Sequence, residues 1–185
     1  MAKLFMMILG ATPTGRHIEQ HDIFFGIADE IKDLVPDIVA YWPEAEGRIH
    51  IDAWREVSAV GDYAITINKK ENSNSRDTQI KLFFLNLGGY KRGEFEEYHY
   101  KMMAVSQDAG EAIRQAKQSA FYKHTSYPGA TSHIDDKYGV DVDDVYAIEE
   151  ILPNKFKEVY NIMITKTGDL PEDELHIGYY KLNKL

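Results

Sequence analysis

The chain of 185 residues contains no cysteine. This absence excludes disulfides, thiolate metal ligands and a cysteine nucleophile. A chain without cysteine suits a reducing compartment, and we therefore expect the protein in the cytoplasm. Seven histidines are present, but they form no tight cluster along the sequence, so we expect neither a metal nor a cofactor.

Acidic residues outnumber basic ones. The 30 Asp and Glu against 21 Lys and Arg give a formal net charge of −9. Without a basic stripe, we expect no nucleic-acid partner. No apolar run approaches the roughly 18 residues that a membrane-spanning helix needs, so we expect no membrane partner either. The apolar segment 4–9 resembles a short signal peptide, but the same pattern returns at 82–87, and we interpret both as strands.

Common catalytic motifs are missing as well. The chain has no Gly-x-Ser-x-Gly and no His-Glu-x-x-His sequence. The segment Gly10–Arg16 carries two glycines but lacks the Gly-Lys-Ser/Thr ending of a phosphate-binding loop. We interpret it as the turn of a hairpin.

An internal repeat is the strongest pattern present. At an offset of 78, Leu4-Phe5, Leu9-Gly10, Gly15, Glu19 and His21 match Leu82-Phe83, Leu87-Gly88, Gly93, Glu97 and His99. At an offset of 83, His50-Ile51-Asp52, Val57 and Tyr63-Ala64-Ile65 match His133-Ile134-Asp135, Val140 and Tyr146-Ala147-Ile148. We therefore predict one copy at 1–70, a connecting loop at 71–79 and a second copy at 80–152. Residues 153–185 are predicted to form a C-terminal hairpin, a partial third repeat, with the whole chain in one compact body.

Each copy reads as strand, strand, helix, strand. The most secure helix begins after Asp108, an N-cap residue with Glu111 in capping-box position, and presents an alanine-rich apolar face. In the first copy Pro36 interrupts the equivalent apolar stripe, which predicts a bend or a late helix start. The pattern indicates an α+β protein with antiparallel sheet and helices packed on one face.

Two pairs of ionisable residues recur and supply the candidate binding site. Residues two apart on a strand share a face, so each Glu-x-His or His-x-Asp pair could orient an imidazole or hold a ligand. The competing interpretation is structural, in which each pair bonds locally at a strand entry. The candidate residues are Glu19, His21, His50, Asp52, Trp54, Glu97, His99, His133 and Asp135.

The runs Gly15–Gly26, Tyr41–Ala45 and His50–Trp54 resemble the domain of unknown function 1543 family, with a looser likeness in the second copy. The resemblance implies a small bacterial cytoplasmic protein with one or two copies of the domain. It brings no activity, cofactor or catalytic residue. We therefore expect a non-catalytic protein that binds an unidentified ligand or protein partner, with a homo-oligomer as a further form that fits the duplicated architecture. The alternative is a small hydrolase-like or metal-dependent enzyme, which would require the Glu-x-His and His-x-Asp pairs to converge at one site.

Overall fold

The computed structural model describes residues 1–70, 79–90, 94–125 and 141–185. The chain divides into two compact units. Unit 1 consists of Met1–Arg76 together with Leu152–Leu185, and unit 2 consists of Asp77–Ile151. Residues 152–185 therefore belong to unit 1, although unit 2 separates them from residues 1–76 in the sequence. Within the described ranges, no helix is both long enough and apolar enough to cross a membrane.

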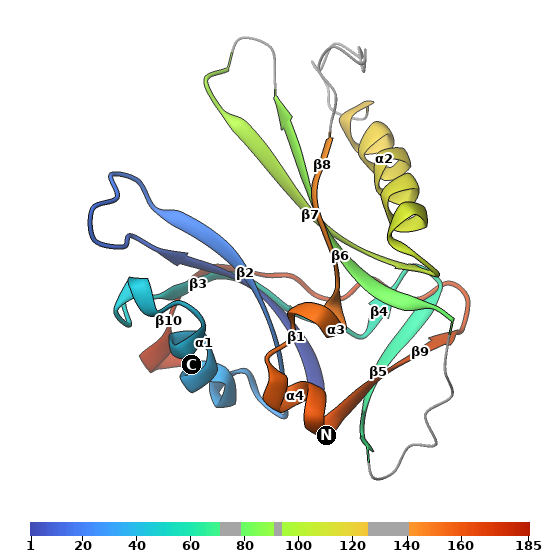
Figure 1. The fold of residues 1–185 in the computed structure, drawn as a ribbon, viewed down its shortest axis with the longest axis horizontal. Coiled ribbons are helices and arrows are strands. Elements are labelled where there is room, and N and C mark those ends of the chain that lie inside the picture. The colour runs from blue at the N-terminus through green and yellow to red at the C-terminus, as the bar shows by residue number, and fades with distance from the viewer. Residues whose placement is uncertain (71–78, 91–93, 126–140) are drawn as a thin grey trace. The chain divides into compact units, whose positions relative to one another are not determined.

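Unit 1 is built around a four-stranded antiparallel sheet in the order β10-β3-β1-β2 (Figure 1). Its strands are β1 (Lys3–Ala11), β2 (Gln20–Ala28), β3 (His50–Glu56) and β10 (His176–Lys181). The central strand β1 reads as a nearly continuous apolar run because almost all of its side chains are buried. The segment 12–19 joins β1 to its antiparallel neighbour β2, so the predicted hairpin is confirmed, but Gly10 belongs to β1 and not to the turn.

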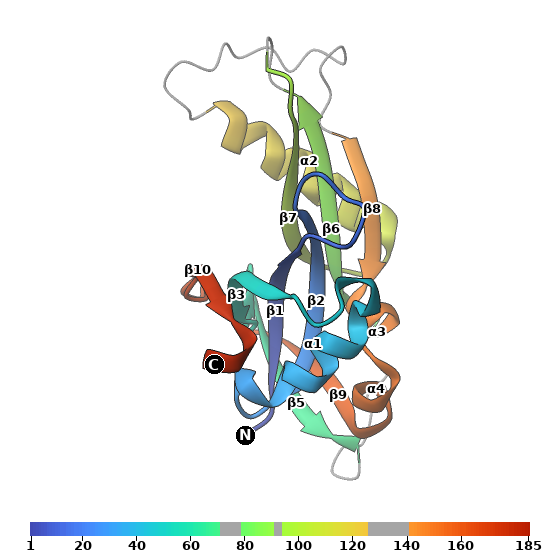
Figure 2. The same ribbon diagram turned by 90° about the vertical axis from the view of Figure 1, so that its left-hand side faces the viewer.

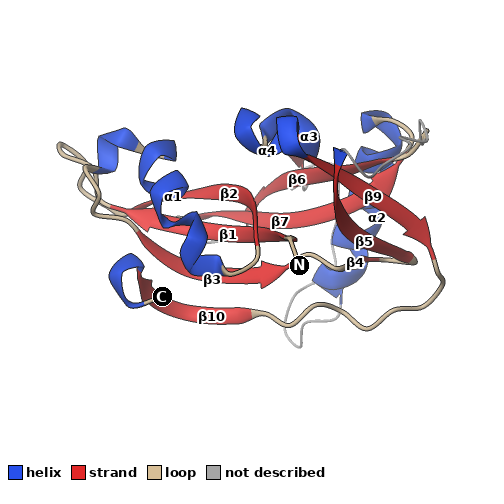
Figure 3. Ribbon diagram, turned by 90° about the horizontal axis from the view of Figure 1, so that it is seen from below, coloured by secondary structure: helices blue, strands red, loops and turns tan. Residues whose placement is uncertain are grey.

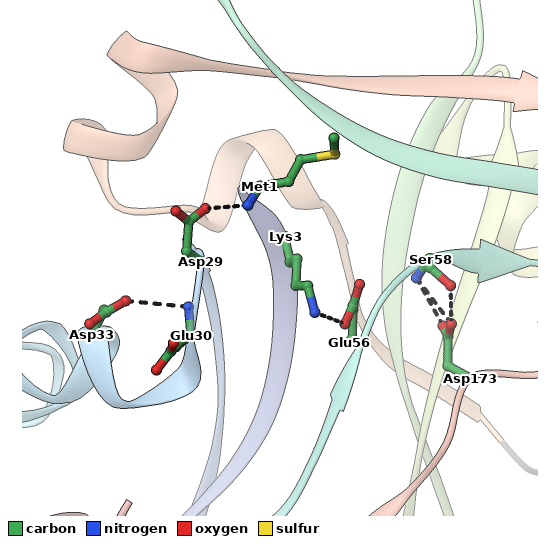
Figure 4. A network of polar contacts seen from close by, with 8 residues as sticks. All are labelled: Met1, Lys3, Asp29, Glu30, Asp33, Glu56, Ser58 and Asp173. Atoms are coloured by element: carbon green, nitrogen blue, oxygen red, sulfur yellow. Dashed lines mark hydrogen bonds and ion pairs between the residues drawn. The ribbon is translucent and has the colours of Figure 1, made fainter.

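A second antiparallel sheet in unit 1 has the order β4-β5-β9. It comprises β4 (Ala59–Val60), β5 (Tyr63–Lys69) and β9 (Tyr160–Lys166). The predicted C-terminal hairpin is wrong, because β9 pairs with β5 while β10 pairs with β3 (Figure 3). The connection between them is held at the β3–β4 junction, where the Asp173 carboxylate accepts hydrogen bonds from Ser58 N and Ser58 Oγ (Figure 4). It also accepts one from Ala59 N. Those bonds direct β10 to the edge of the larger sheet.

The helices of unit 1 are short. They are η1 (Ile31–Leu34), α1 (Val35–Tyr41), η2 (Pro43–Ala45), α4 (Asn154–Val159) and η5 (Leu182–Lys184). Pro36 lies in the first turn of α1, where its missing N–H leaves no helical hydrogen bond unmade. The predicted interruption at this proline thus takes the form of a 3-10 turn followed by an α-helix. A capping box between Glu30 and Asp33 begins that turn (Figure 4).

Unit 2 contains a three-stranded antiparallel sheet in the order β7-β6-β8, covered by a helix (Figure 2). Its elements are β6 (Lys81–Tyr90), β7 (Glu97–Ser106), α2 (Ala109–Thr125), β8 (Asp141–Ala147) and α3 (Ile148–Ile151). The predicted start of α2 is confirmed, since Asp108 Oδ1 accepts from Glu111 N and Glu111 Oε2 accepts from Gln107 N. Ala112 and Ala116 are fully buried against Leu85 and other apolar residues of the sheet.

The second block of the predicted repeat is wrong in its alignment. Residues 63–65 belong to β5, whereas residues 146–148 end β8 and begin α3. In unit 2, Val142 pairs with Leu87 in the way that Ile51 pairs with Leu9 in unit 1, so Asp141–Asp143 takes the place of His50–Asp52. The error arises because β8 begins 35 residues after β7 ends, whereas β3 begins only 22 residues after β2 ends, so the corresponding strand of unit 2 lies further along the chain. His133, Ile134 and Asp135 lie outside the described residues.

Candidate functional site

Three neighbouring strands of unit 1 bring two histidines to either side of a glycine. Gly10 of β1 pairs with His21 of β2 and with His50 of β3. Glu19 directly precedes β2 and lies two residues before His21. The pairing register thus places both predicted pairs, Glu-x-His and His-x-Asp, beside the same point of the sheet.

A β-bulge adds the fourth side chain. Ile8 pairs with Ala53, but the next residue, Leu9, pairs with Ile51, so Asp52 is the extra residue on β3. Bulges commonly redirect a side chain next to a functional site. Here the carboxylate of Asp52 reaches the space above Gly10 that the His50 ring also enters.

Glu19, His21, His50 and Asp52, which we call the Gly10 cluster, have their polar atoms within contact distance. His50 Nε2 lies 3.2 Å from Glu19 Oε1 and 3.1 Å from Asp52 Oδ1. His21 Nε2 lies 3.1 Å from Asp52 Oδ2 and 3.5 Å from Glu19 Oε2. Each carboxylate therefore presents one oxygen to each imidazole.

The close approaches to His50 are not hydrogen bonds. Within the described part of the chain, His50 Nε2 and Asp52 Oδ2 are buried and have no hydrogen-bond partner. The His50 side chain is only 7% exposed, so bulk solvent has little access to this atom. A buried polar atom without a partner costs free energy. Two such atoms lie side by side here, next to further carboxylate and imidazole atoms of the same cluster.

Gly10 provides the space for this arrangement. A Cβ atom at position 10 would lie 2.4 Å from His50 Nε2 and 2.6 Å from Asp52 Oδ2. The backbone of Gly10 is not in the left-handed region, so the requirement for glycine comes from close packing alone. The recurrence of Leu-Gly at the end of a strand is the sequence signal for this feature, although the sequence alone favours a turn at this point.

Aromatic rings border the cluster on the side of β10. The Tyr179 ring lies over His50 with a centroid separation of 4.1 Å. Trp54, a candidate binding residue from the sequence, stacks on His176 at 3.8 Å with an interplanar angle of 9° and lies 6.1 Å from the Phe5 ring. Trp54 therefore supports the attachment of β10, while Tyr179, which the sequence did not reveal, covers the buried histidine.

Unit 2 contains a related but exposed group of Glu97, His99 and Asp143. His99 Nε2 lies 3.6 Å from Asp143 Oδ2, and Gly88 occupies the position that corresponds to Gly10. Asp143 was missed because the sequence alignment had given its place to Asp135, which is not among the described residues. The structure thus brings Glu97 and His99 together, with Asp143 as their third member.

Residues 16–67 match the model of a family described as Domain of Unknown Function (DUF1543). The matched range contains all four residues of the Gly10 cluster. No curated protein matches the chain. The crystal structure of a protein Il1583 from Idiomarina loihiensis is similar to this structure over 98% of both chains, with a TM-score of 0.65 and 20% sequence identity. That likeness concerns the fold.

Proposed function

We propose that unit 1 binds a divalent cation through Glu19, His50 and Asp52. The ligand atoms of these three residues lie within 4.8 Å of one another. The observation that carries the proposal is the Nε2 atom of His50, which is buried, has no hydrogen-bond partner among the described residues and lies beside two carboxylate oxygens. A cation would satisfy all three groups at once.

The spacing of the donor atoms fits this role. Nitrogen and oxygen ligands lie about 2.0–2.2 Å from a zinc ion, so two ligands of one ion are roughly 3.0–3.5 Å apart. His50 Nε2 lies 3.1 and 3.2 Å from the two oxygens. Imidazole with carboxylates and no thiolate suits Zn²⁺, Mn²⁺ or Fe²⁺ better than Ca²⁺, which prefers oxygen ligands alone.

Three ligands from the protein leave further coordination positions for water or another ligand. The side chains of Glu19 and His21 are 42% and 46% exposed, so the open side of the cluster faces solvent. This exposure keeps a metal-dependent enzyme as the second candidate function, with His21 beside the open position. We propose the cytoplasm as the location of either activity.

We further propose that the two units descend from one repeated unit. In its support, β2-β1-β3 and β7-β6-β8 have the same strand order, and Gly10, Glu19 and His21 correspond to Gly88, Glu97 and His99 in the pairing register.

Calorimetric titration of the metal-free full chain with Zn²⁺ and with Mn²⁺ tests the proposed function. Asp52→Asn keeps the shape of the side chain but removes its charge, and we expect it to weaken the tighter binding event by roughly tenfold or more. Asp143→Asn makes the matched change in the exposed group of unit 2 and should leave that event unchanged. Equal affinities for the wild type and Asp52→Asn would contradict the proposal.

A further inference from the structure

We propose that the Gly10 cluster holds two cations, with the carboxylates of Glu19 and Asp52 bridging between them. This inference rests on the proposed function. In the arrangement, His50 is the terminal ligand of one cation and His21 is the terminal ligand of the other.

The carboxylate oxygens divide into two sets. Glu19 Oε1 and Asp52 Oδ1 lie 3.2 and 3.1 Å from His50 Nε2. Glu19 Oε2 and Asp52 Oδ2 lie 3.5 and 3.1 Å from His21 Nε2. Each imidazole nitrogen therefore has one oxygen from each carboxylate at the separation expected for ligands of a common ion, about 3.0–3.5 Å.

Hydrogen bonding does not explain why the second set of carboxylate oxygens lies so close to His21 Nε2. Asp52 Oδ2 is a buried atom that accepts no hydrogen bond from any described residue, although His21 Nε2 lies only 3.1 Å away. The first set contains the other atom in this condition, His50 Nε2. Each set thus includes one buried polar atom without a partner. A cation in the first set would satisfy His50 Nε2, and a cation in the second would satisfy Asp52 Oδ2.

The two positions differ in their access to solvent. His50 is buried beneath the Tyr179 ring, whereas His21 is about half-exposed. The cation at His50 is therefore the tighter one, and the cation at His21 exchanges more readily.

The charge balance of the two-cation centre indicates which kind of further ligand would bind to it. Two divalent cations bring four positive charges, and the two bridging carboxylates neutralise half of them. Neighbouring pairs of metal ions commonly bind the oxygens of phosphoryl groups and other oxyanions between them. The remaining charge and the solvent-facing side at His21 favour a small oxyanion as the bridging ligand.

Unit 2 provides an internal contrast. Its sheet places Asp141, an aspartate, at the register position that His50 occupies in unit 1. His99 is thus the single imidazole that the corresponding positions supply, so the two-histidine arrangement belongs to unit 1.

The test is a Mn²⁺ titration of the full chain carrying His99→Ala, which removes the histidine of the unit 2 group. Metal analysis gives the stoichiometry, and electron paramagnetic resonance reports whether bound ions are exchange-coupled. We expect two Mn²⁺ per chain with a coupled spectrum. Adding His21→Ala, a change at a half-exposed position, should leave one uncoupled Mn²⁺ whose affinity changes by no more than a few-fold.

The outcomes separate the two proposals. One Mn²⁺ per chain that is indifferent to His21→Ala overturns the two-cation centre and leaves the proposed function standing. No binding of Mn²⁺ or Zn²⁺ overturns both. Neither decision depends on His50→Ala, which would change the packing as well as the binding because His50 is buried.

Discussion

The Nε2 atom of His50 lies 2.4 Å from the point at which an alanine at position 10 would place its Cβ, so the His50 ring packs directly against the Gly10 backbone. The contact explains why a glycine sits near the end of the buried strand β1. Glycine weakens strands unless a close approach requires it. The position is therefore part of the candidate site, although its residue has no side chain.

Gly10→Ala should displace the His50 ring and the Asp52 carboxylate. We expect the change to overpack the unit 1 sheet, lowering the free energy of unfolding by about 1–3 kcal/mol, and to weaken cation binding. Gly88→Ala is the matched control, because it meets the Asp143 carboxylate, an exposed group that can rotate away. Denaturant melts and cation titrations of both variants measure the effect, and equal losses in the two would contradict this account of Gly10.

Tyr179→Ala should uncover His50. The ring of Tyr179 lies over the imidazole, so its removal admits water to the inner cation position. We expect faster cation release, measured by stopped-flow with a chelator in excess. Tyr179→Phe keeps the ring and should behave as the wild type. An effect of the same size in Tyr179→Phe would mean that the hydroxyl, not the ring, matters.

Ala116→Leu should destabilise unit 2, because Ala116 is fully buried where α2 approaches the sheet. Overpacking of this kind costs about 1–3 kcal/mol. The neighbouring Lys117 is exposed, and Lys117→Leu introduces the same side chain where there is room for it. Urea unfolding followed by circular dichroism compares the two, and a neutral Ala116→Leu would mean that the helix face packs more loosely than described.

The partly buried Lys101 should make the free energy of unfolding depend on pH. Burial lowers the pKa of the Lys101 ammonium below its usual range, so the folded state gives up this proton before the unfolded chain does. The unfolded state then binds more protons between the lowered value and about pH 10.4, and stability from this group rises with pH across that window. Lys101→Met should remove the rise and should be more stable than the wild type near pH 7, unlike Lys117→Met at an exposed position. The check is a set of urea melts from pH 7 to about pH 11.

Local chemistry explains what the sequence could predict. The start of α2 follows from Asp108 and Glu111, whose side chains bond to backbone N–H groups within four residues. The candidate residues Glu19, His21, His50 and Asp52 were recognisable as same-face pairs on strands. Both inferences depend only on neighbours along the chain.

The features that escaped prediction depend on contacts distant in sequence. Whether two pairs on β2 and β3 converge is decided by their common register against Gly10 and by the bulge at Asp52. The place of Asp143 depends on the length of the whole connection between β7 and β8, which no repeat offset revealed. The attachment of β10 depends on Asp173 reaching Ser58, 115 residues away along the chain.

The discontinuity of unit 1 has a consequence for biosynthesis. The strands that carry Gly10, His21 and His50 leave the ribosome early, but β10 follows only after all of unit 2 has been translated. At ordinary rates of synthesis this interval lasts several seconds. During it, the β3 edge is unpaired and His50 lacks the ring of Tyr179, so the proposed cation site stays open to solvent until β10 is added.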